Sequence, residues 1–383
     1  MKALTTSSQI LCEVRAGVGI ITLNAERSLN ALTLQMFKDL QMTFDAWAKD
    51  EDVRCIFLRG AGGKAFCAGG DVKQMAKDII ELKKQAPNVV APDLPPQGFI
   101  VDYFKYEYRC DYTIHKFEKP IVVWADGICM GGGIGLENGA SHRIVTERSK
   151  FAMPEIAIGL YPDVGGTWFL NKMPGSFGLI AGMTGLRMNA ADCLYLGLAD
   201  FYISSDLESA VLEALVEINW SNDDEVNFDK VDKVLVKFDT SEDLEMSPAE
   251  AHVDWASKFD DVQSAARFRE ILMTHANDDA WINEAFRNFE YGSPSSAHVI
   301  FEQLRRSKAF SLEQVFESEL NLSVRATMHP DYAEGVRALL IDKDNKPNWS
   351  PAKFEDVTKE WVDSYFVQLA ETNPEGWLSG ESR

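Results

Sequence analysis

The chain has 383 residues, of which 46% are hydrophobic and 25% are charged. A chain of this length can bury the core of one large domain with an appendage, or the cores of two domains. Its formal net charge of −21 argues against non-specific nucleic-acid binding, because such binding depends on Lys and Arg residues that neutralise phosphates.

The first elements predicted along the chain are two strands and a helix. Residues 10–14 (ILCEV) and 18–23 (VGIITL) are strand-like runs around a glycine-containing turn, which is typical of a hairpin. Residues 28–50 place apolar side chains at helical spacing, with Ser28 as the candidate N-cap.

The same order of elements then recurs. The strand-like run VRCIFLRG and a glycine-rich loop precede a helical pattern at residues 71–84. The stretch Gln85–Gly98 contains four prolines and no periodicity, which predicts a loop or an insertion. A helix over residues 101–117, the strand KPIVVWADGI, the glycine turn MGGGIG with a short helix, and the strand HRIVTE follow.

The repeated strand-strand-helix order predicts an α/β fold without the strict βαβ alternation of a dinucleotide-binding sheet. MGGGIG also lacks the acidic residue that follows a dinucleotide fingerprint at the appropriate distance. Beyond Asp200, helical patterns separated by acidic loops dominate. We therefore predict a strand-strand-helix core over residues 1–200 and a mostly helical C-terminal region over residues 201–383.

The cysteines and histidines show no spacing that is typical of a disulfide framework or a metal site. The six histidines form no HxxxH or HExxH pattern, so we expect no zinc site. The six cysteines have no CxxC pair, which predicts buried thiols in a reducing compartment. They are Cys12, Cys55, Cys67, Cys110, Cys129 and Cys193.

The N-terminal segment MKALTTSSQILCEV lacks both the long apolar core of a signal peptide and the Arg-rich helix of a transit peptide. No apolar run approaches the roughly 20 residues that a membrane span needs. These features predict a soluble, cytoplasmic protein with no membrane partner.

Two glycine turns of similar placement are candidates for binding a negatively charged oxygen. CAGGD (Cys67–Asp71) and MGGGIG (Met130–Gly135) each lie between a predicted strand and a predicted helix, where backbone N–H groups are unpaired. If one N–H from each turn converged, the pair would form an oxyanion hole, in which each donor contributes about 3 kcal/mol to an acyl-transfer transition state. Each turn by itself is more often only a tight corner.

Two carboxylates follow on the segment PEIAIGLYPDVGG. Glu155 lies among apolar residues, which fits either an exposed loop position or a site residue in an apolar pocket. Asp163 precedes a Val-Gly-Gly sequence and fits a turn former or a helix cap equally well as a site residue. Together with the glycine turns, the two carboxylates are suited to chemistry on a thioester carbonyl.

Three segments carry a resemblance to a known family: KAFCAGGDVKQM, ADGICMGGGIGL and FAMPEIAIGLYPDVGGTWFL. They resemble signatures of the crotonase (enoyl-CoA hydratase/isomerase) superfamily. Within it, the C-terminal segments SPSSAHVIFEQLRR and DYAEGVRALLIDKDNKPNW are similar to the 3-hydroxyisobutyryl-CoA hydrolases. The resemblance implies a crotonase-like spiral with its CoA thioester site in residues 1–200. The proline-rich stretch is longer than is usual in that family.

The resemblance also implies roles for individual residues. Gly70 and Gly132 match the two oxyanion-hole N–H donors, Glu155 matches the catalytic glutamate, and Asp163 matches the second catalytic carboxylate. Hydratases of the superfamily place a further glutamate three residues after the oxyanion glycine, where this chain has Gly135. Hydrolysis of a thioester therefore fits better than hydration of an enoyl double bond.

Three more positions are implied to bind substrate. Glu107 matches a glutamate of the substrate pocket, Ala68 lies where the loop backbone meets the adenine of CoA, and Lys73 is a candidate phosphate partner beside it. CoA is part of the substrate, so no separate cofactor and no metal are expected.

The predicted reaction is hydrolysis of a short 3-hydroxyacyl-CoA, as in valine degradation. The substrate would be 3-hydroxyisobutyryl-CoA or 3-hydroxypropionyl-CoA, which differ by one methyl group. Glu155, ionised unless burial desolvates it, would attack the carbonyl to form an anhydride or deprotonate a water. Enoyl-CoA hydratase or isomerase activity and non-catalytic acyl-CoA binding are the alternatives. A homo-oligomer is a further possibility, because crotonase relatives often form trimers or hexamers.

Overall fold

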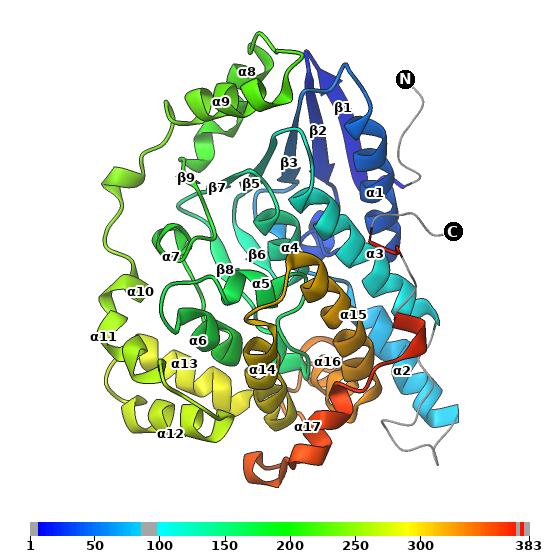
Figure 1. Cartoon of the computed structure of the whole chain (residues 1–383), viewed down its shortest axis with the longest axis vertical. Helices are drawn as coiled ribbons and strands as arrows, with labels where there is room; N and C mark the ends of the chain where they lie inside the picture. Colours follow the sequence, from blue (N-terminus) through cyan, green and yellow to red (C-terminus); the bar gives the residue numbers. More distant parts are fainter. Residues whose placement is uncertain (1–6, 86–97, 373–375, 379–383) are drawn as a thin grey trace. The chain divides into compact units, whose positions relative to one another are not determined.

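The computed structural model of the chain describes residues 7–85, 98–372 and 376–378 (Figure 1). It divides into two compact units, each of which combines three segments of the chain. The first unit comprises the chain up to Gly70, Arg109–Phe151 and Met188–Ala251, and the second comprises Asp71–Tyr108, Ala152–Arg187 and the chain from His252 onward. The division at residue 200 rests on composition along the chain and stays a prediction.

Strands occur in the first unit, where they form two sheets. Their bounds are β1 Ile10–Arg15, β2 Val18–Leu23, β3 Cys55–Gly60, β4 Ala65–Cys67, β5 Ile121–Ala125, β6 Ile128–Met130, β7 His142–Val145, β8 Lys150–Ala152 and β9 Phe201–Tyr202. The large sheet has the order β1-β2-β3-β5-β7-β9, and the small sheet has the order β4-β6-β8. β1 and β2 form the predicted antiparallel hairpin, and the other neighbours in the large sheet are parallel.

The predicted repeat explains this arrangement. In the successive pairs β3–β4, β5–β6 and β7–β8, the first strand joins the large sheet and the second joins the small sheet. Each repeat thus adds one strand to each sheet, which gives a spiral. The predicted α/β fold of repeated strand-strand-helix units is confirmed.

Helices and helical turns complete the first unit. They are η1 Glu26–Ser28, α1 Leu34–Ala48, α4 Gly132–Asn138, α7 Ala190–Tyr195, η3 Ser205–Leu207, α8 Glu208–Val216, α9 Asp224–Leu235, η4 Ser241–Asp243 and α10 Pro248–Ala251. In Figure 1, α1 runs alongside β1, and the two elements are in contact. Beyond β9, the described residues that adopt regular structure are helical, as predicted for the C-terminal region.

The second unit is built from helices. They are α2 Val72–Gln85, α3 Gly98–His115, η2 Glu155–Ile158, α5 Gly166–Leu170, α6 Phe177–Thr184, α11 Val253–Ala256, η5 Ser257–Phe259, α12 Ala265–His275, α13 Ala280–Tyr291, α14 Pro294–Ser307, α15 Leu312–Met328, α16 Pro330–Val336, η6 Arg337–Ile341, η7 Phe354–Asp356, α17 Lys359–Tyr365 and η8 Ala370–Thr372. The C-terminal part of α3 belongs to the first unit.

Alternation along β2 shows how the large sheet is covered on both faces. Val18 and Ile20 belong to a buried cluster that includes residues of α8 and α9. Gly19 points to the opposite face, because successive residues of a strand alternate. A Cβ atom on Gly19 would lie 2.7 Å from the ring of Trp47 in α1, so glycine is needed for this close approach.

Helix α1 begins later than the sequence predicts. Its N-cap is Thr33, whose side chain accepts a hydrogen bond from Met36 N at 3.2 Å, so the prediction of Ser28 as N-cap is wrong. The physical reason is that Leu29 and Asn30 have φ angles of +55° and +57°, which place a turn before the helix.

Two further predictions concern the cysteines and a membrane span. All six cysteines are free thiols, and five of them are buried. Within the described ranges, no helix is long and apolar enough to span a bilayer. The interior of the proline-rich stretch, residues 86–97, lies outside the described residues.

Candidate active site

The two glycine turns of the first unit follow neighbouring strands of the small sheet. β4 and β6 pair in parallel, so the turns that contain Gly70 and Gly132 leave the sheet in the same direction. Gly69 has a φ of +100°, and a Cβ atom on it would lie 3.0 Å from Met130 O and 3.5 Å from Gly132 N. The two turns are therefore close together, and glycine allows their backbones to approach.

Helix α4 begins at the second turn with Gly132 as its first residue. A Cβ atom on Gly133 would lie 2.4 Å from the carbonyl oxygen of Cys67, so the start of α4 can approach β4 only with glycine there. Neither the Gly70 N–H nor the Gly132 N–H donates to another loop or turn in the part of the chain that the structure describes. Both N–H groups are thus suited to donate a hydrogen bond to an oxygen of a ligand. The oxyanion hole itself stays a prediction.

The two residues predicted to contact CoA have different surroundings. Ala68 is half-buried in the first unit, and its N–H donates to Leu29 O at 3.0 Å, which fixes the loop. Lys73 is the second residue of α2 in the second unit, and its side chain is exposed. Their contacts with adenine and phosphate stay predictions.

The predicted catalytic carboxylates both lie in the second unit. Glu155 begins η2, Asp163 lies in the loop before α5, and each residue is only 5% exposed. Their charges interact, because the carboxylate of Asp163 raises the pKa of Glu155. The structure therefore brings these two side chains into one buried group, and it excludes an exposed loop position for Glu155.

Burial raises the pKa of both acids, but the two carboxyl groups differ in their hydrogen bonds. Burial first, and then the charge of Asp163, raise the pKa of Glu155 well above its usual value, and Glu155 Oε2 has no hydrogen-bond partner among the described residues. Burial also raises the pKa of Asp163, to about 6, but hydrogen bonds from Tyr108 and Ser323 oppose the rise. In the unliganded chain Glu155 therefore binds a proton more readily than Asp163 does.

Three hydroxyl groups form a chain of hydrogen bonds that ends at Asp163. Tyr108 OH donates to Asp163 Oδ2 at 2.6 Å and lies 2.5 Å from Ser323 Oγ. Ser323 Oγ in turn lies 2.8 Å from Tyr161 OH. All three residues are fully or almost fully buried. Sequence reasoning missed them as functional residues.

The turn after Asp163 has an unusual backbone that a distant carboxylate holds in place. Val164 and Gly165 have φ angles of +54° and +80°, and a positive φ is strained for a β-branched residue. The Glu319 carboxylate accepts hydrogen bonds from Gly165 N at 2.7 Å, from Thr167 N at 3.0 Å and from the Thr167 hydroxyl. Helix α15 therefore fixes the loop that carries Asp163.

A signal for these residues existed in the sequence of α15. Phe316, Glu319, Leu320 and Ser323 follow one another at helical spacing, and all four are buried. Two polar residues on an otherwise apolar helix face are expected to have specific partners.

Glu107, predicted to line the substrate pocket, is 3% exposed, and its charge raises the pKa of its neighbour Tyr108.

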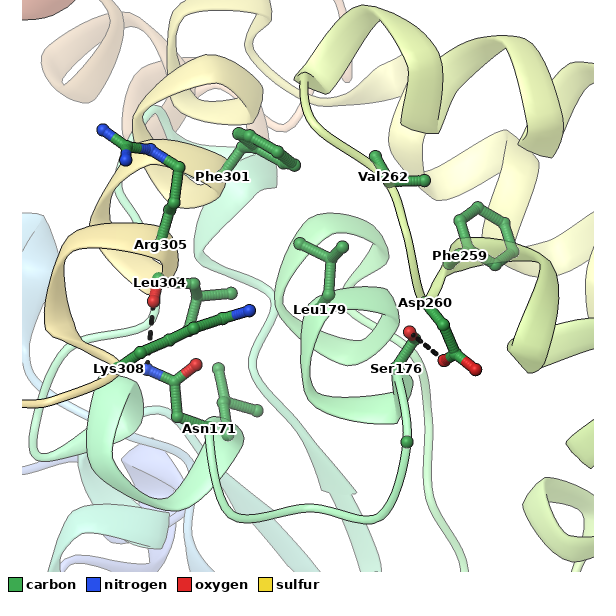
Figure 2. A pocket seen from close by; sticks show the side chains of 12 residues that line it. Asn171, Ser176, Leu179, Phe259, Asp260, Val262, Phe301, Leu304, Arg305 and Lys308 are labelled. Atoms are coloured by element: carbon green, nitrogen blue, oxygen red, sulfur yellow. Dashed lines mark hydrogen bonds between the residues drawn. The ribbon is translucent and has the colours of Figure 1, made fainter.

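A surface pocket of about 470 Å³ lies elsewhere in the second unit (Figure 2). Figure 2 shows Ser176 hydrogen-bonded to Asp260 on one side of it and Lys308 reaching across from the other. Its lining residues are Leu170, Asn171, Gly175, Ser176, Leu179, Phe259, Asp260, Val262, Phe301, Leu304, Arg305 and Lys308. None of the predicted site residues is among them, so we do not assign the reaction to this pocket.

Comparison with known proteins identifies the family. Residues 18–366 match the enoyl-CoA hydratase/isomerase family. The chain belongs to this family. It is 35% identical to the mitochondrial 3-hydroxyisobutyryl-CoA hydrolase of Rattus norvegicus, over 96% of this chain and 91% of the rat protein.

Two solved structures share the fold. A carnitinyl-CoA dehydratase from Mycobacterium thermoresistibile has a TM-score of 0.83 and 32% identity, covering 97% of this chain and 100% of its own. An enoyl-CoA hydratase from Rhodobacter sphaeroides has a TM-score of 0.81 and 30% identity, and the match covers 95% of this chain and 99% of the hydratase chain. The resemblance that the glycine turns and the PEIAIGLYPDVGG segment carry is confirmed.

Proposed function

We propose that this chain hydrolyses a short 3-hydroxyacyl-CoA thioester to the free acid and CoA, with 3-hydroxyisobutyryl-CoA as the substrate. The name of the rat relative supports this substrate, and the similarity extends over nearly the whole chain. The observation that carries the proposal is the buried pair of Glu155 and Asp163 combined with glycine at position 135.

Position 135 separates hydrolysis from hydration. By the family resemblance, a hydratase has a glutamate three residues after the oxyanion glycine, and Gly135 supplies no carboxylate there. Addition of water to an enoyl double bond needs an acid and a base in place together. For this reason we favour hydrolysis over the hydratase and dehydratase reactions that the two solved structures are named for.

In the proposed mechanism, the thioester oxygen accepts hydrogen bonds from Gly70 N and Gly132 N, which stabilise the oxyanion as it forms. Ionised Glu155 either attacks the carbonyl carbon or takes a proton from a water that attacks it. The carbon–sulfur bond then breaks, and the CoA thiolate leaves and takes up a proton. In the first route, water subsequently hydrolyses the mixed anhydride.

Asp163 has a separate role in this proposal. With a pKa of about 6, it is ionised at neutral pH and accepts a hydrogen bond from the 3-hydroxyl group of the substrate or from the hydrolytic water. A hydrogen-bonding site of this kind discriminates against acyl groups that lack the hydroxyl, because its buried carboxylate is then left without that partner.

The test is release of free thiol from 3-hydroxyisobutyryl-CoA and from crotonyl-CoA, followed with a thiol-reactive dye. We expect release from the hydroxyacyl ester alone, and loss of this activity by about 10²-fold or more in Glu155→Gln. The variant should still bind the ester in a calorimetric titration. Near-wild-type hydrolysis by Glu155→Gln would remove the assignment of Glu155, and water addition to crotonyl-CoA without thiol release would favour a hydratase.

The cofactor requirement and the compartment are part of the proposal. Two carboxylates and two amides supply the chemistry, so we expect activity to survive dialysis against a chelator.

The reaction fits valine degradation, as the resemblance implies. The rat relative is named as mitochondrial, which adds a mitochondrial location to the cytoplasmic one predicted from the sequence. Cell fractionation distinguishes them, and a homo-oligomer stays a prediction.

A further inference from the structure

Asp163 is a buried carboxylate surrounded by hydroxyl groups and other acids. The titratable groups that act on it or respond to its charge are Glu155 of η2, Tyr108 of α3, Tyr161 of its own loop, Glu319 of α15 and Tyr332 of α16. None of these groups is a cation. A buried carboxylate in such surroundings stays ionised only if hydrogen-bond donors replace the water that it has lost.

The direction of the donors follows from counting protons. Each hydroxyl carries one proton, and Tyr108 uses its own in the 2.6 Å bond to Asp163 Oδ2. In the 2.5 Å contact between Tyr108 OH and Ser323 Oγ, Ser323 must then be the donor. Tyr161 donates to Ser323 or to Glu319 O, at 2.8 and 2.9 Å. The protons of Tyr108 and Ser323 are thus both directed toward the carboxylate.

We propose that Tyr108 is a positioning residue that, with Ser323 behind it, orients Asp163 and stabilises its ionised form during the reaction. This inference rests on the proposed function, in which ionised Asp163 contacts the substrate. The donor in direct contact is Tyr108, and Ser323 increases its strength by donating to the phenol oxygen. The 3.5 Å contact from Ser323 Oγ to Asp163 Oδ2 is long and contributes little directly.

Orientation follows from the same contacts. Tyr108 OH donates to Oδ2 of Asp163, which restrains the rotation of the carboxyl group about its last torsion. The loop behind it is held at Val164 and Gly165 by Glu319. Asp163 is thus restrained at its carboxyl group and through its backbone loop. These restraints keep the hydrogen-bond acceptor in position when substrate binds.

The test is the pH dependence of kcat/KM for thiol release by Tyr108→Phe. The substitution removes one oxygen and preserves the ring. A hydrogen bond to a charged group corresponds to about one to two pH units, so we expect the transition that reports Asp163 to move upward by this amount. Ser323→Ala should move it in the same direction by less. Tyr332→Phe is the matched control, because Tyr332 is also fully buried but its OH contacts Met75 Sδ at 3.3 Å.

A second readout does not depend on turnover. Infrared titration of the carboxyl band in the Glu155→Gln background, with Asp163→Asn as the subtraction reference, reports the protonation of Asp163 alone. We expect the same upward movement when Tyr108→Phe is added. If Tyr108→Phe lowers activity equally at all pH values and leaves the infrared titration unchanged, Tyr108 is only a packing residue and the proposal is overturned. Absence of thiol release by the wild-type chain would contradict the proposed function instead.

Discussion

At the residue scale, Glu155 and Asp163 differ in the hydrogen bonds that reach their carboxyl groups. Hydroxyl donors surround Asp163, whereas Glu155 Oε2 has no hydrogen-bond partner among the described residues. Two neighbouring acids in different surroundings take different protonation states, and this difference assigns their roles. A raised pKa makes ionised Glu155 a stronger base but reduces the fraction that is ionised at neutral pH.

We therefore expect kcat for thiol release from 3-hydroxyisobutyryl-CoA to rise with pH above neutrality. Glu155 acts as nucleophile or base only when ionised, and burial and the charge of Asp163 raise its pKa, so its ionised fraction grows at higher pH than that of an exposed glutamate. The measurement is the rate at saturating substrate, with spontaneous ester hydrolysis subtracted at each pH. A rate that falls over this range would make protonated Glu155 the active form, as a general acid.

At the element scale, α15 connects the C-terminal region to the loop of the candidate site. Glu319 binds the turn after Asp163, and Ser323, one helical turn further on, binds Tyr108. The Glu319 carboxylate provides acceptors for Gly165 N and Thr167 N at the start of α5, where backbone N–H groups have no partner within the helix. The C-terminal region thus shapes the candidate site.

Replacing Glu319 with alanine should destabilise the second unit. The substitution removes the acceptor of two backbone amides and one hydroxyl in a buried place, and unsatisfied buried donors cost about 3 kcal/mol together. Urea unfolding followed by tryptophan fluorescence measures the loss. Glu317→Ala is the control, because Glu317 lies on the same helix but is exposed. Equal midpoints for the two variants would contradict a structural role for Glu319.

At the scale of the whole molecule, the sequence predicts what is local and misses what depends on distant contacts. The repeat of strands and helices follows from short periodic patterns, and Glu155 and Asp163 could be assigned by resemblance because they lie on one short segment. Ser323 lies 160 residues from Asp163, and Glu319 lies 154 from Gly165. Their pairing depends on how α15 packs, which no local pattern specifies.

The interior of the chain also holds acids outside the site, and these link stability to pH. Glu137 of α4 is 0% exposed, and neither of its carboxyl oxygens has a hydrogen-bond partner among the described residues. Burial raises its pKa from 4.5 to about 8, and the charge of Arg143 opposes the rise only in part. Burial also raises the pKa of Glu319, the acid that holds the loop of Asp163, to about 8.

We expect Glu137 and Glu319 to lower the stability of the folded chain as the pH rises from about 5 to about 9. Because the pKa of Glu137 is higher in the folded than in the unfolded chain, this group binds more protons in the folded chain over this range, so its contribution to the free energy of unfolding falls with rising pH. A difference of one pKa unit corresponds to about 1.4 kcal/mol. Urea midpoints of wild type and Glu137→Gln at both pH values measure the contribution of Glu137.

The two proteins should differ mainly at high pH. A glutamine side chain cannot ionise, so Glu137→Gln should match wild type near pH 5 and exceed its stability near pH 9. Exposed Glu217, replaced by glutamine, is the control for the change of surface charge, which also affects stability in a chain with a net charge of −21. If Glu137→Gln and Glu217→Gln change the pH dependence equally, the buried carboxyl of Glu137 is not its source.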